Sequence, residues 1–422
     1  MNYIVYCCFL GNFLKMFGPV IKAQCENHPD SKPILWICKN FKNYKPKEGT
    51  ELSSTQINEL QKLFPDLIII ESESLSDIVK KYPVFAVVSI SFSFPLDHDE
   101  YIFLKKRNIK LCTIGYVGEE LLYILNNGYE VLDKWDIITT FSTFWIDLFC
   151  NIINNTDKAR EIRKKIKPIG FVELDQIREF DEKKIREKYK IPSGKKVIYF
   201  STYPYFYSII PYLYKYIDIA FRKGGRISCR IVSELSQIIS PGLEIERIVD
   251  YRQILSSLKD TAKKKDYIVI TKSRKKHKDP EMIKTYTDHL FYDESYYPFG
   301  TLELMYISDI YIGFQSASII ETLFLGKYSA TLLPIPRQIY DRGLGSFGND
   351  GIFENYLWRI DGVSDRFKLY KNDEYERYID FLQRIDNISF NDEQRRLSVE
   401  KIFSHDDFKA SNRFLDLVFS AI

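Results

Sequence analysis

The sequence predicts an α/β protein with two domains, each built around a parallel sheet. Short apolar runs alternate with segments of helical spacing, and this pattern stops at a charged stretch and then starts again. The chain has 422 residues and 45% hydrophobic content, enough to bury more than one core. Together these observations favour two successive α/β domains.

The strands expected in the first half are continuous apolar runs rich in β-branched and aromatic residues. Such runs are typical of parallel strands that are buried on both faces. In chain order they are "YIVYCCF", "PILWICK", "LIIIES", "FAVVSISFSF", "KLCTIGY" and "DIITTFS".

The second half repeats the pattern after the charged stretch "REFDEKKIREKYKIPSGKK", which suits an exposed linker. Helices are expected around Ile283 to His289 and in "ASIIETLFLG", which Gly326 would end. The expected domains span residues 1–175 and 176–398, followed by a closing helix over 399–422. The strands expected here are "KVIYFST", "RISCRIVS", "YIVITKS", "DIYIGFQS" and "YSATLLP".

Composition excludes several classes of protein. The 60 Lys and Arg nearly balance the 57 Asp and Glu, so no nucleic-acid partner is expected. Seven cysteines form no CxxC pair, as in reduced intracellular proteins.

The N-terminal apolar stretch lacks a basic start and carries Lys15, which is unlike a signal peptide, so a cytoplasmic location is expected. The five histidines show no zinc spacing, P-loop and GxSxG motifs are absent from the sequence, and no GxGxxG follows the first strand.

One turn carries the strongest functional pattern. In "DIYIGFQSASIIETLFLGK", residues 315–318 follow a parallel strand, at the edge where α/β sheets bind ligands. Ser318 and Glu321 match a helix-capping box, which needs no ligand. The same serines, with Ser316 and free N–H groups, could instead hold a phosphate while Glu321 accepts the two hydroxyls of a ribose. Both interpretations are open at this level.

Several motifs in one order resemble the GT-B glycosyltransferases, particularly the branch related to CDP-glycerol glycerophosphotransferases and UDP-N-acetylglucosamine 2-epimerases. The resemblance implies two Rossmann-like domains with parallel sheets facing an interdomain cleft. It rests on "NFLKMFGPVIKA", "KPIGFVELDQI", "IPSGKKVIYFSTYP", "YIVITKS", "SDIYIGFQSASIIETLFLGKYSATLL", "YDRGLGSFGNDG" and "SHDDFKASNRFLDLV".

This resemblance implies a glycosyltransferase that moves a sugar from a nucleotide-sugar donor to a glycan or lipid-linked acceptor in surface polysaccharide or glycoconjugate synthesis. The nucleotide sugar is a co-substrate, and neither a metal nor another cofactor is expected. The C-terminal domain would hold the donor through Ser201, Thr202, Lys272, Ser316, Ser318 and Glu321. A solvated strand end is the alternative for Lys272.

The general base is sought in the first domain, in loops after strands. The candidates are Asp97 and His98 in "PLDHDEY" and Glu119 in "VGEE". Solvation and helix capping explain such loop residues equally simply. Asp97 and Asp99 also form an Asp-x-Asp pattern, which is the metal-diphosphate motif of the other large glycosyltransferase fold and could bind Mg²⁺ or Mn²⁺. The double α/β layout predicted here opposes that other fold.

Two departures from the family pattern keep other functions open. "TIGYVGEE" and "TKSRKKHKDP" stand where glycerophosphotransferase-like proteins carry a His-Gly and a Lys-Pro-His-Pro turn. The alternatives are a nucleotide-sugar epimerase or hydrolase, a CDP-glycerol-type polyol-phosphate transferase and a non-catalytic nucleotide-binding member. The basic clusters "EIRKKIK", "AKKKD" and "SRKKHK" suit either peripheral association with the inner face of a membrane or a solvated surface.

Overall fold

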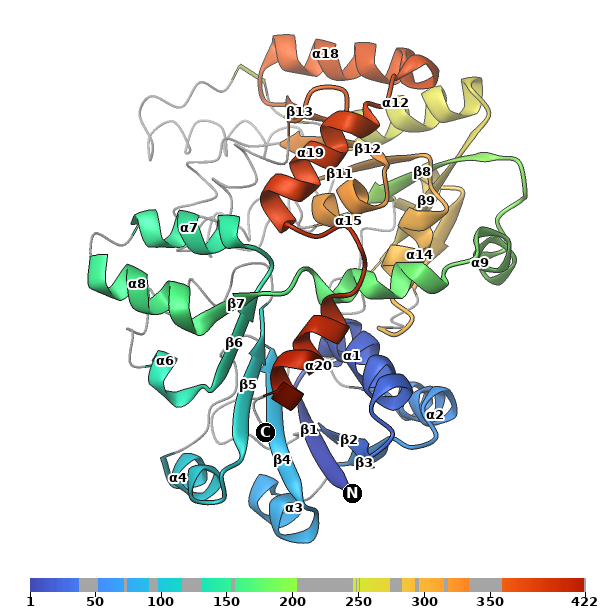
Figure 1. The fold of residues 1–422 in the computed structure, drawn as a ribbon. Helices are drawn as coiled ribbons and strands as arrows, with labels where there is room; N and C mark the ends of the chain where they lie inside the picture. Colours follow the sequence, from blue (N-terminus) through green and yellow to red (C-terminus); the bar gives the residue numbers. More distant parts are fainter. Residues whose placement is uncertain are drawn as a thin grey trace, which may run out of the picture. The chain divides into compact units, whose positions relative to one another are not determined.

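The computed structural model divides the chain into two compact α/β units, each with its own parallel sheet (Figure 1). Unit 1 comprises Met1–Phe180, Ser295–Gly300 and Ser398–Ile422, and unit 2 comprises Asp181–Glu294 and Thr301–Leu397. The predicted α/β architecture with two parallel sheets is thereby confirmed. The structure describes residues 1–37, 52–71, 74–90, 98–115, 131–152, 156–202, 246–247, 249, 251–273, 283–292, 296–314, 318–333 and 359–420.

The sheet of unit 1 has seven parallel strands in the order β3-β2-β1-β4-β5-β6-β7. Strand β1 lies inside the sheet, between β2 and β4, and its residues Ile4 to Cys8 are buried, as expected for a strand that is covered on both faces. The strands are β1 (Asn2–Cys8), β2 (Ser31–Ile37), β3 (Ile68–Ile70), β4 (Val84–Ile90), β5 (Lys110–Ile114), β6 (Ile137–Thr140) and β7 (Ile166–Pro168).

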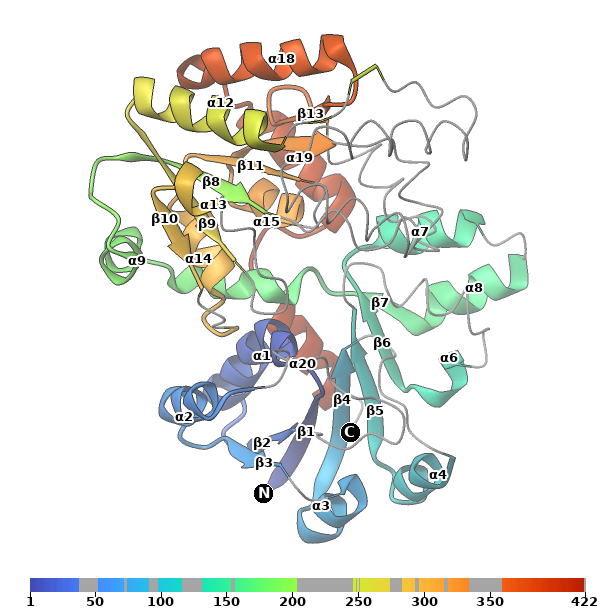
Figure 2. The ribbon, with the colours of Figure 1, turned by 180° about the vertical axis from the view of Figure 1, so that it is seen from behind.

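Two helices of unit 1, α2 and α3, begin at serine caps. Ser53 forms a complete capping box with Gln56, and the Ser74 side chain accepts a hydrogen bond from the N–H of Asp77. Figure 2 shows the unit from behind. Its helices are η1 (Gly11–Phe13), α1 (Leu14–Asn27), α2 (Ser54–Leu63), α3 (Leu75–Lys81), α4 (His98–Lys106), α6 (Val131–Lys134), α7 (Thr143–Ile152), α8 (Thr156–Lys165), η2 (Val172–Glu179) and α20 (Ala410–Ser420).

The sheet of unit 2 has six parallel strands in the order β10-β9-β8-β11-β12-β13. These are β8 (Lys196–Ser201), β9 (Tyr267–Lys272), β10 (His289–Phe291), β11 (Ile310–Phe314), β12 (Tyr328–Leu333) and β13 (Ser364–Lys368). The helices are α9 (Glu182–Tyr189), α12 (Tyr251–Lys264), α13 (Ile283–Tyr286), α14 (Gly300–Tyr306), α15 (Ser318–Phe324), α18 (Asn372–Gln383) and η3 (Ile385–Asn387). Helix α19 (Asp392–Phe403) runs across the boundary at Leu397 into unit 1.

The structure corrects two details of the sequence prediction. The helix expected around Ile283 to His289 ends at Tyr286, and His289 begins strand β10. Strands β7, β10 and β13 were not predicted, because they are short or carry charged residues within an otherwise β-compatible stretch. The predicted strand "RISCRIVS" lies outside the described residues.

An aspartate placed directly before a strand pairs with the neighbouring strand in both units. The N–H of Asp309 donates to the carbonyl of Val197, and the N–H of Val197 donates to the Asp309 carboxylate at 2.6 Å. Asp288 makes the same reciprocal pair with Val269, and Asp136 makes it with Leu111. Each pair fixes the register at the amino end of two adjacent strands and satisfies an otherwise unpaired amide.

The segment Ser295–Gly300 belongs to unit 1 although it lies far from that unit in sequence. Within unit 1, the N–H of Phe299 donates to Oε1 of Gln176 at 2.7 Å. The Tyr297 ring lies so close to Gly18 that a Cβ atom there would come within 2.2 Å of the ring, so helix α1 requires glycine at this point. Among the described helices, none combines the length and apolarity of a membrane span.

Candidate functional site

The carboxyl edge of the unit 2 sheet contains the point where the strand order reverses. Strand β8 has β9 as its neighbour on one side and β11 as its neighbour on the other, so the reversal lies between β8 and β11. In open α/β sheets the loops at such a reversal leave in opposite directions, and ligands bind in the crevice between them. Of the predicted donor-binding residues, Ser201 ends β8, Lys272 ends β9, and Ser318 begins the helix after β11.

Ser201 is the last residue of β8 and lies in register with Gly313 of β11, so the two flank the reversal directly. Thr202 follows, half-buried. A Cβ atom at residue 313 would lie 2.9 Å from Cβ of Ser201 and 2.5 Å from the hydroxyl of Tyr311. Glycine therefore leaves room for the Tyr311 side chain beside Ser201.

Lys272 is the last residue of the adjacent strand β9 and is only 8% exposed. It pairs in register with Phe291 at the end of β10. A lysine this buried contradicts the alternative of a solvated strand end, because an ammonium group leaves water only where charges or dipoles replace the hydration. Lys272 thus puts a positive charge into the packed carboxyl edge.

Helix α15 follows β11 and begins at Ser318, where Ser318 and Glu321 are 7% and 5% exposed. The predicted helix end is confirmed: Gly326 has φ +64°, and the N–H of Lys327 donates to the carbonyl of Thr322 at 3.0 Å, as in a Schellman motif. Ser316 lies outside the described residues. The capping and phosphate interpretations of this turn therefore both remain predictions.

The candidate bases follow β4 and β5 in the sequence of unit 1. Asp97 and Glu119 lie outside the described residues, and of His98 the structure shows only that it begins α4. Strand β4 lies beside β1, where the strand order of this sheet also reverses. A base in the loop after β4 would thus belong to the ligand-binding edge of unit 1.

A buried ion pair that sequence reasoning missed lies at the start of α1. Nζ of Lys15 is 2.7 Å from Oε2 of Glu173, and the two side chains are 10% and 0% exposed. The same ammonium is 5.2 Å from the centre of the Phe299 ring. The signal was present as a single lysine in an apolar helical stretch, which is seldom buried without an acidic partner.

The segment "SHDDFKASNRFLDLV" has a structural explanation. Arg413 binds the Asp407 carboxylate through both terminal nitrogens, at 2.8 and 3.0 Å, and its Nε donates to the carbonyl of Ile169. The N–H groups of Ala410 and Ser411 donate to the carboxylate of Asp175, which caps helix α20. Burial raises the pKa of Asp175, against the opposing effect of hydrogen bonds from Ser411 and Ala410 and the charge of Arg413.

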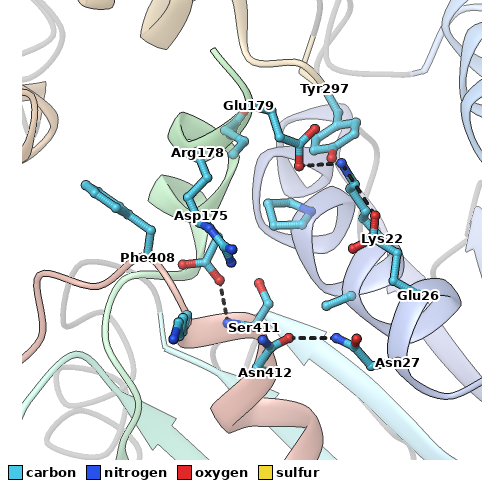
Figure 3. Close-up of a pocket in the computed structure, with 14 residues that line it drawn as sticks. Lys22, Glu26, Asn27, Asp175, Arg178, Glu179, Tyr297, Phe408, Ser411 and Asn412 are labelled. Carbon is cyan, nitrogen blue, oxygen red and sulfur yellow. Dashed lines mark hydrogen bonds and ion pairs between the residues drawn. The ribbon is translucent and has the colours of Figure 1, made fainter.

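A pocket of about 340 Å³ opens in unit 1 beside this cap (Figure 3). Its walls come from the second half of α1, from η2, from Tyr297 and from the start of α20. The lining residues are Pro19, Lys22, Ala23, Glu26, Asn27, Asp175, Gln176, Arg178, Glu179, Tyr297, Phe408, Lys409, Ser411 and Asn412. Among the described residues, no group of three or more potential metal ligands comes together.

Comparison with known proteins identifies the fold. No family model and no curated protein matches the chain. A solved structure of the wall teichoic acid polymerase TagF is similar over 100% of this chain and 88% of that chain, with 16% identity and a TM-score of 0.58. A putative UDP-N-acetylglucosamine 2-epimerase from Listeria monocytogenes is similar over 99% and 96%, with 9% identity and a TM-score of 0.56.

The S. aureus protein MnaA in complex with UDP is similar over 100% of this chain and 98% of that chain, with 10% identity and a TM-score of 0.53. At such identities the likeness shows the fold and not the activity. The two parallel sheets, each with a reversal beside its first strand, agree with that fold. The chain therefore has the GT-B-like fold of TagF and the UDP-N-acetylglucosamine 2-epimerases, as its motifs predicted.

Proposed function

We propose that this protein is a glycosyltransferase that moves a sugar from a nucleotide-sugar donor to a glycan or lipid-linked acceptor. The observation that carries the proposal is the position of Ser201 and Thr202 at the strand reversal of unit 2, with Lys272 at the end of the neighbouring strand β9. The other strand at the reversal, β11, leads into Ser318 and Glu321. Hydroxyl groups and one buried cation at this edge suit a diphosphate.

In the proposed reaction, the acceptor hydroxyl attacks the anomeric carbon of the donor sugar. The bond between that carbon and the diphosphate oxygen breaks, and the nucleoside diphosphate leaves with the electron pair. Lys272, together with the hydroxyls of Ser201 and Thr202 and of the turn containing Ser316, would stabilise the charge that develops on the leaving group.

Two further roles complete the proposal. Glu321 would accept hydrogen bonds from the ribose hydroxyls, and a carboxylate or imidazole of unit 1 would take the proton from the acceptor. The candidates for this base are Asp97, His98 and Glu119. No step of the proposed reaction passes through a metal; Lys272 and the hydroxyl groups would reduce the charge that develops on the diphosphate. The basic clusters would hold the enzyme at the inner face of a membrane that carries the acceptor.

A second candidate is a nucleotide-sugar epimerase or hydrolase, which the likeness to the Listeria protein favours. The likeness to TagF suggests a further candidate activity, the transfer of a polyol phosphate from a CDP-glycerol-type donor. These activities use the same nucleotide site and differ in what happens to the group attached to it. Consumption of a nucleotide sugar without an acceptor would indicate the epimerase or hydrolase.

A thermal-shift panel of UDP-, CDP-, CMP- and GDP-linked donors tests the proposal. One nucleotide class should raise the melting temperature, since a ligand at 100 times its dissociation constant adds about 2.7 kcal/mol to stability. Release of the nucleoside diphosphate from that donor should then require an added acceptor. A panel without any shift would contradict nucleotide binding, and binding without turnover would indicate the non-catalytic alternative.

A further inference from the structure

The pocket of unit 1 is placed apart from the edge that the proposed reaction uses. Helix α1 starts at the carboxyl edge of the sheet, after β1, and runs back toward the amino edge, where β2 begins. The pocket residues of α1 extend from Pro19 to Asn27, in the second half of this helix. At about 1.5 Å per residue, Lys22 and Glu26 lie about 12 and 18 Å along the axis from the helix start.

The acidic groups of the pocket already have partners. Glu179 binds Nζ of Lys22 at 2.5 Å, and Glu26 lies 3.7 Å from the same ammonium (Figure 3). The carboxylate of Asp175 accepts the N–H groups of Ala410 and Ser411 at 3.1 and 2.6 Å. The lining has three acidic and three basic side chains, and these contacts leave two of the basic ones without an acidic partner.

Two cations in the pocket lack such partners. Arg178 and Lys409 are both exposed, and neither side chain forms an ion pair or hydrogen bond with any residue in the described part of the chain. They come from η2 and from the residue before α20, two segments far apart in sequence. Two cations that line one concave site favour an anion with several oxygen atoms, because guanidinium and ammonium groups both bind phosphate.

The remaining wall suits hydroxyl groups. The Asn27 amide donates to Oδ1 of Asn412 at 3.2 Å, which holds the two amides in place and leaves further amide N–H and C=O positions for a ligand. Pro19, Ala23 and Phe408 supply apolar surface. The volume of about 340 Å³ falls at the lower end of the range for small-molecule sites.

We propose that this pocket is a second binding site, distinct from the nucleotide-sugar site, for a small phosphate ester that carries hydroxyl groups, such as a phosphorylated sugar. Arg178 and Lys409 bind the phosphate, and Asn27 and Asn412 bind hydroxyls. The bound ligand connects η2 and α20 through its phosphate and thereby stabilises the attachment of the C-terminal helix to unit 1.

The test measures binding of glucose 1-phosphate, inorganic phosphate and glucose by titration calorimetry. Neither Arg178 nor Lys409 belongs to the proposed nucleotide site, so substitution of these two residues separates binding in the pocket from binding at that site. Glucose 1-phosphate should bind more tightly than inorganic phosphate, and glucose should not bind measurably. Arg178→Ala and Lys409→Ala should each weaken glucose 1-phosphate binding at least tenfold, whereas Arg160→Ala, which removes an exposed cation of α8, should leave it unchanged.

Both pocket substitutions are at exposed positions, and circular dichroism verifies that the variants remain folded. Hydrogen exchange of α20 provides a second readout: glucose 1-phosphate should slow it in the parent protein and have no effect in Arg178→Ala. The proposal is overturned by absence of glucose 1-phosphate binding, by equal binding of glucose or of inorganic phosphate, or by binding that both pocket substitutions leave intact. Because nucleotide binding is measured separately, failure here leaves the proposed transferase function standing.

Discussion

Lys15 and Glu173 form a buried ion pair, with Nζ and Oε2 2.7 Å apart and side chains that are 10% and 0% exposed. Lys15 belongs to the first turn of α1, and Glu173 belongs to η2. Helix η2 lies directly before Phe180, where the first segment of unit 1 ends. The pair joins the first βα connection of the sheet to the segment through which the chain leaves the unit.

Removing one member of this ion pair should lower the stability of unit 1 far more than replacing both members with apolar residues. Glu173→Gln leaves the buried Lys15 ammonium without its counter-charge and should destabilise unit 1 by about 3–5 kcal/mol. The double variant Lys15→Met with Glu173→Leu removes both charges at similar volume and should regain most of that loss. Urea unfolding followed by tryptophan fluorescence reports on unit 1, where Trp36, Trp135 and Trp145 are buried. A single variant as stable as wild type would contradict the pair's structural role.

The aspartate before β11 should contribute to strand register. Asp309→Ala removes the acceptor of the Val197 N–H and leaves this amide unsatisfied, which should cost about 1–3 kcal/mol. Asp309→Asn retains an acceptor and should lose less. Asp157→Ala provides the control, because the Asp157 side chain is 86% exposed and lies in a surface pair with Arg160. If Asp309→Ala had the same melting temperature as this control, the reciprocal pairing of Asp309 with Val197 would not contribute to stability.

Attachment of the C-terminal helix should weaken in acid. The His28 ring stacks on Phe419 of α20 with centroids 3.9 Å apart, and burial lowers the pKa of His28. Burial, with the charge of Arg413, also lowers the pKa of His405. The unfolded chain therefore takes up protons first as pH falls below about 6.5, and the stability from both histidines is lost between that pH and their folded pKa.

Hydrogen exchange of α20 at pH 7.5 and 5.5 measures this effect. Exchange corrected for its intrinsic pH dependence should be faster at pH 5.5 in wild type. The variant His28→Phe keeps the stacking partner of Phe419 without a titrating group and should reduce the difference. Equal protection at both pH values in wild type would contradict the prediction.

The sequence predicted what depends on local pattern. Continuous apolar runs identified β1, β4 and β11, and Gly326 marked the end of α15, because burial on both faces and left-handed backbone restrict the residues allowed. Short strands such as β10 were missed, since three half-buried residues carry no period. The aspartates before strands were visible in "DIITTF", "DHLF" and "DIYIGF", but their role emerges only when the neighbouring strand is known.

The site was predictable in part. Ser201 and Lys272 follow apolar runs, and parallel topology brings strand ends to one edge. The Lys15–Glu173 pair and the pocket beside Asp175 unite residues more than 150 positions apart, and Ser295–Gly300 joins unit 1 from within the sequence of unit 2. Such contacts depend on how the chain returns to unit 1, which no local pattern encodes.

Discrimination between ribose and deoxyribose tests the central claim most directly. The nucleoside diphosphate that responds in the thermal-shift panel, and its 2′-deoxy analogue, are titrated into wild type, Glu321→Ala and the exposed control Glu187→Ala. A carboxylate hydrogen bond is worth about 1.5–3 kcal/mol, so wild type and control should prefer ribose by about 10- to 100-fold, and Glu321→Ala should bind both equally. A folded Glu321→Ala that binds the ribonucleotide as tightly as wild type, with the same preference for ribose, would contradict the account.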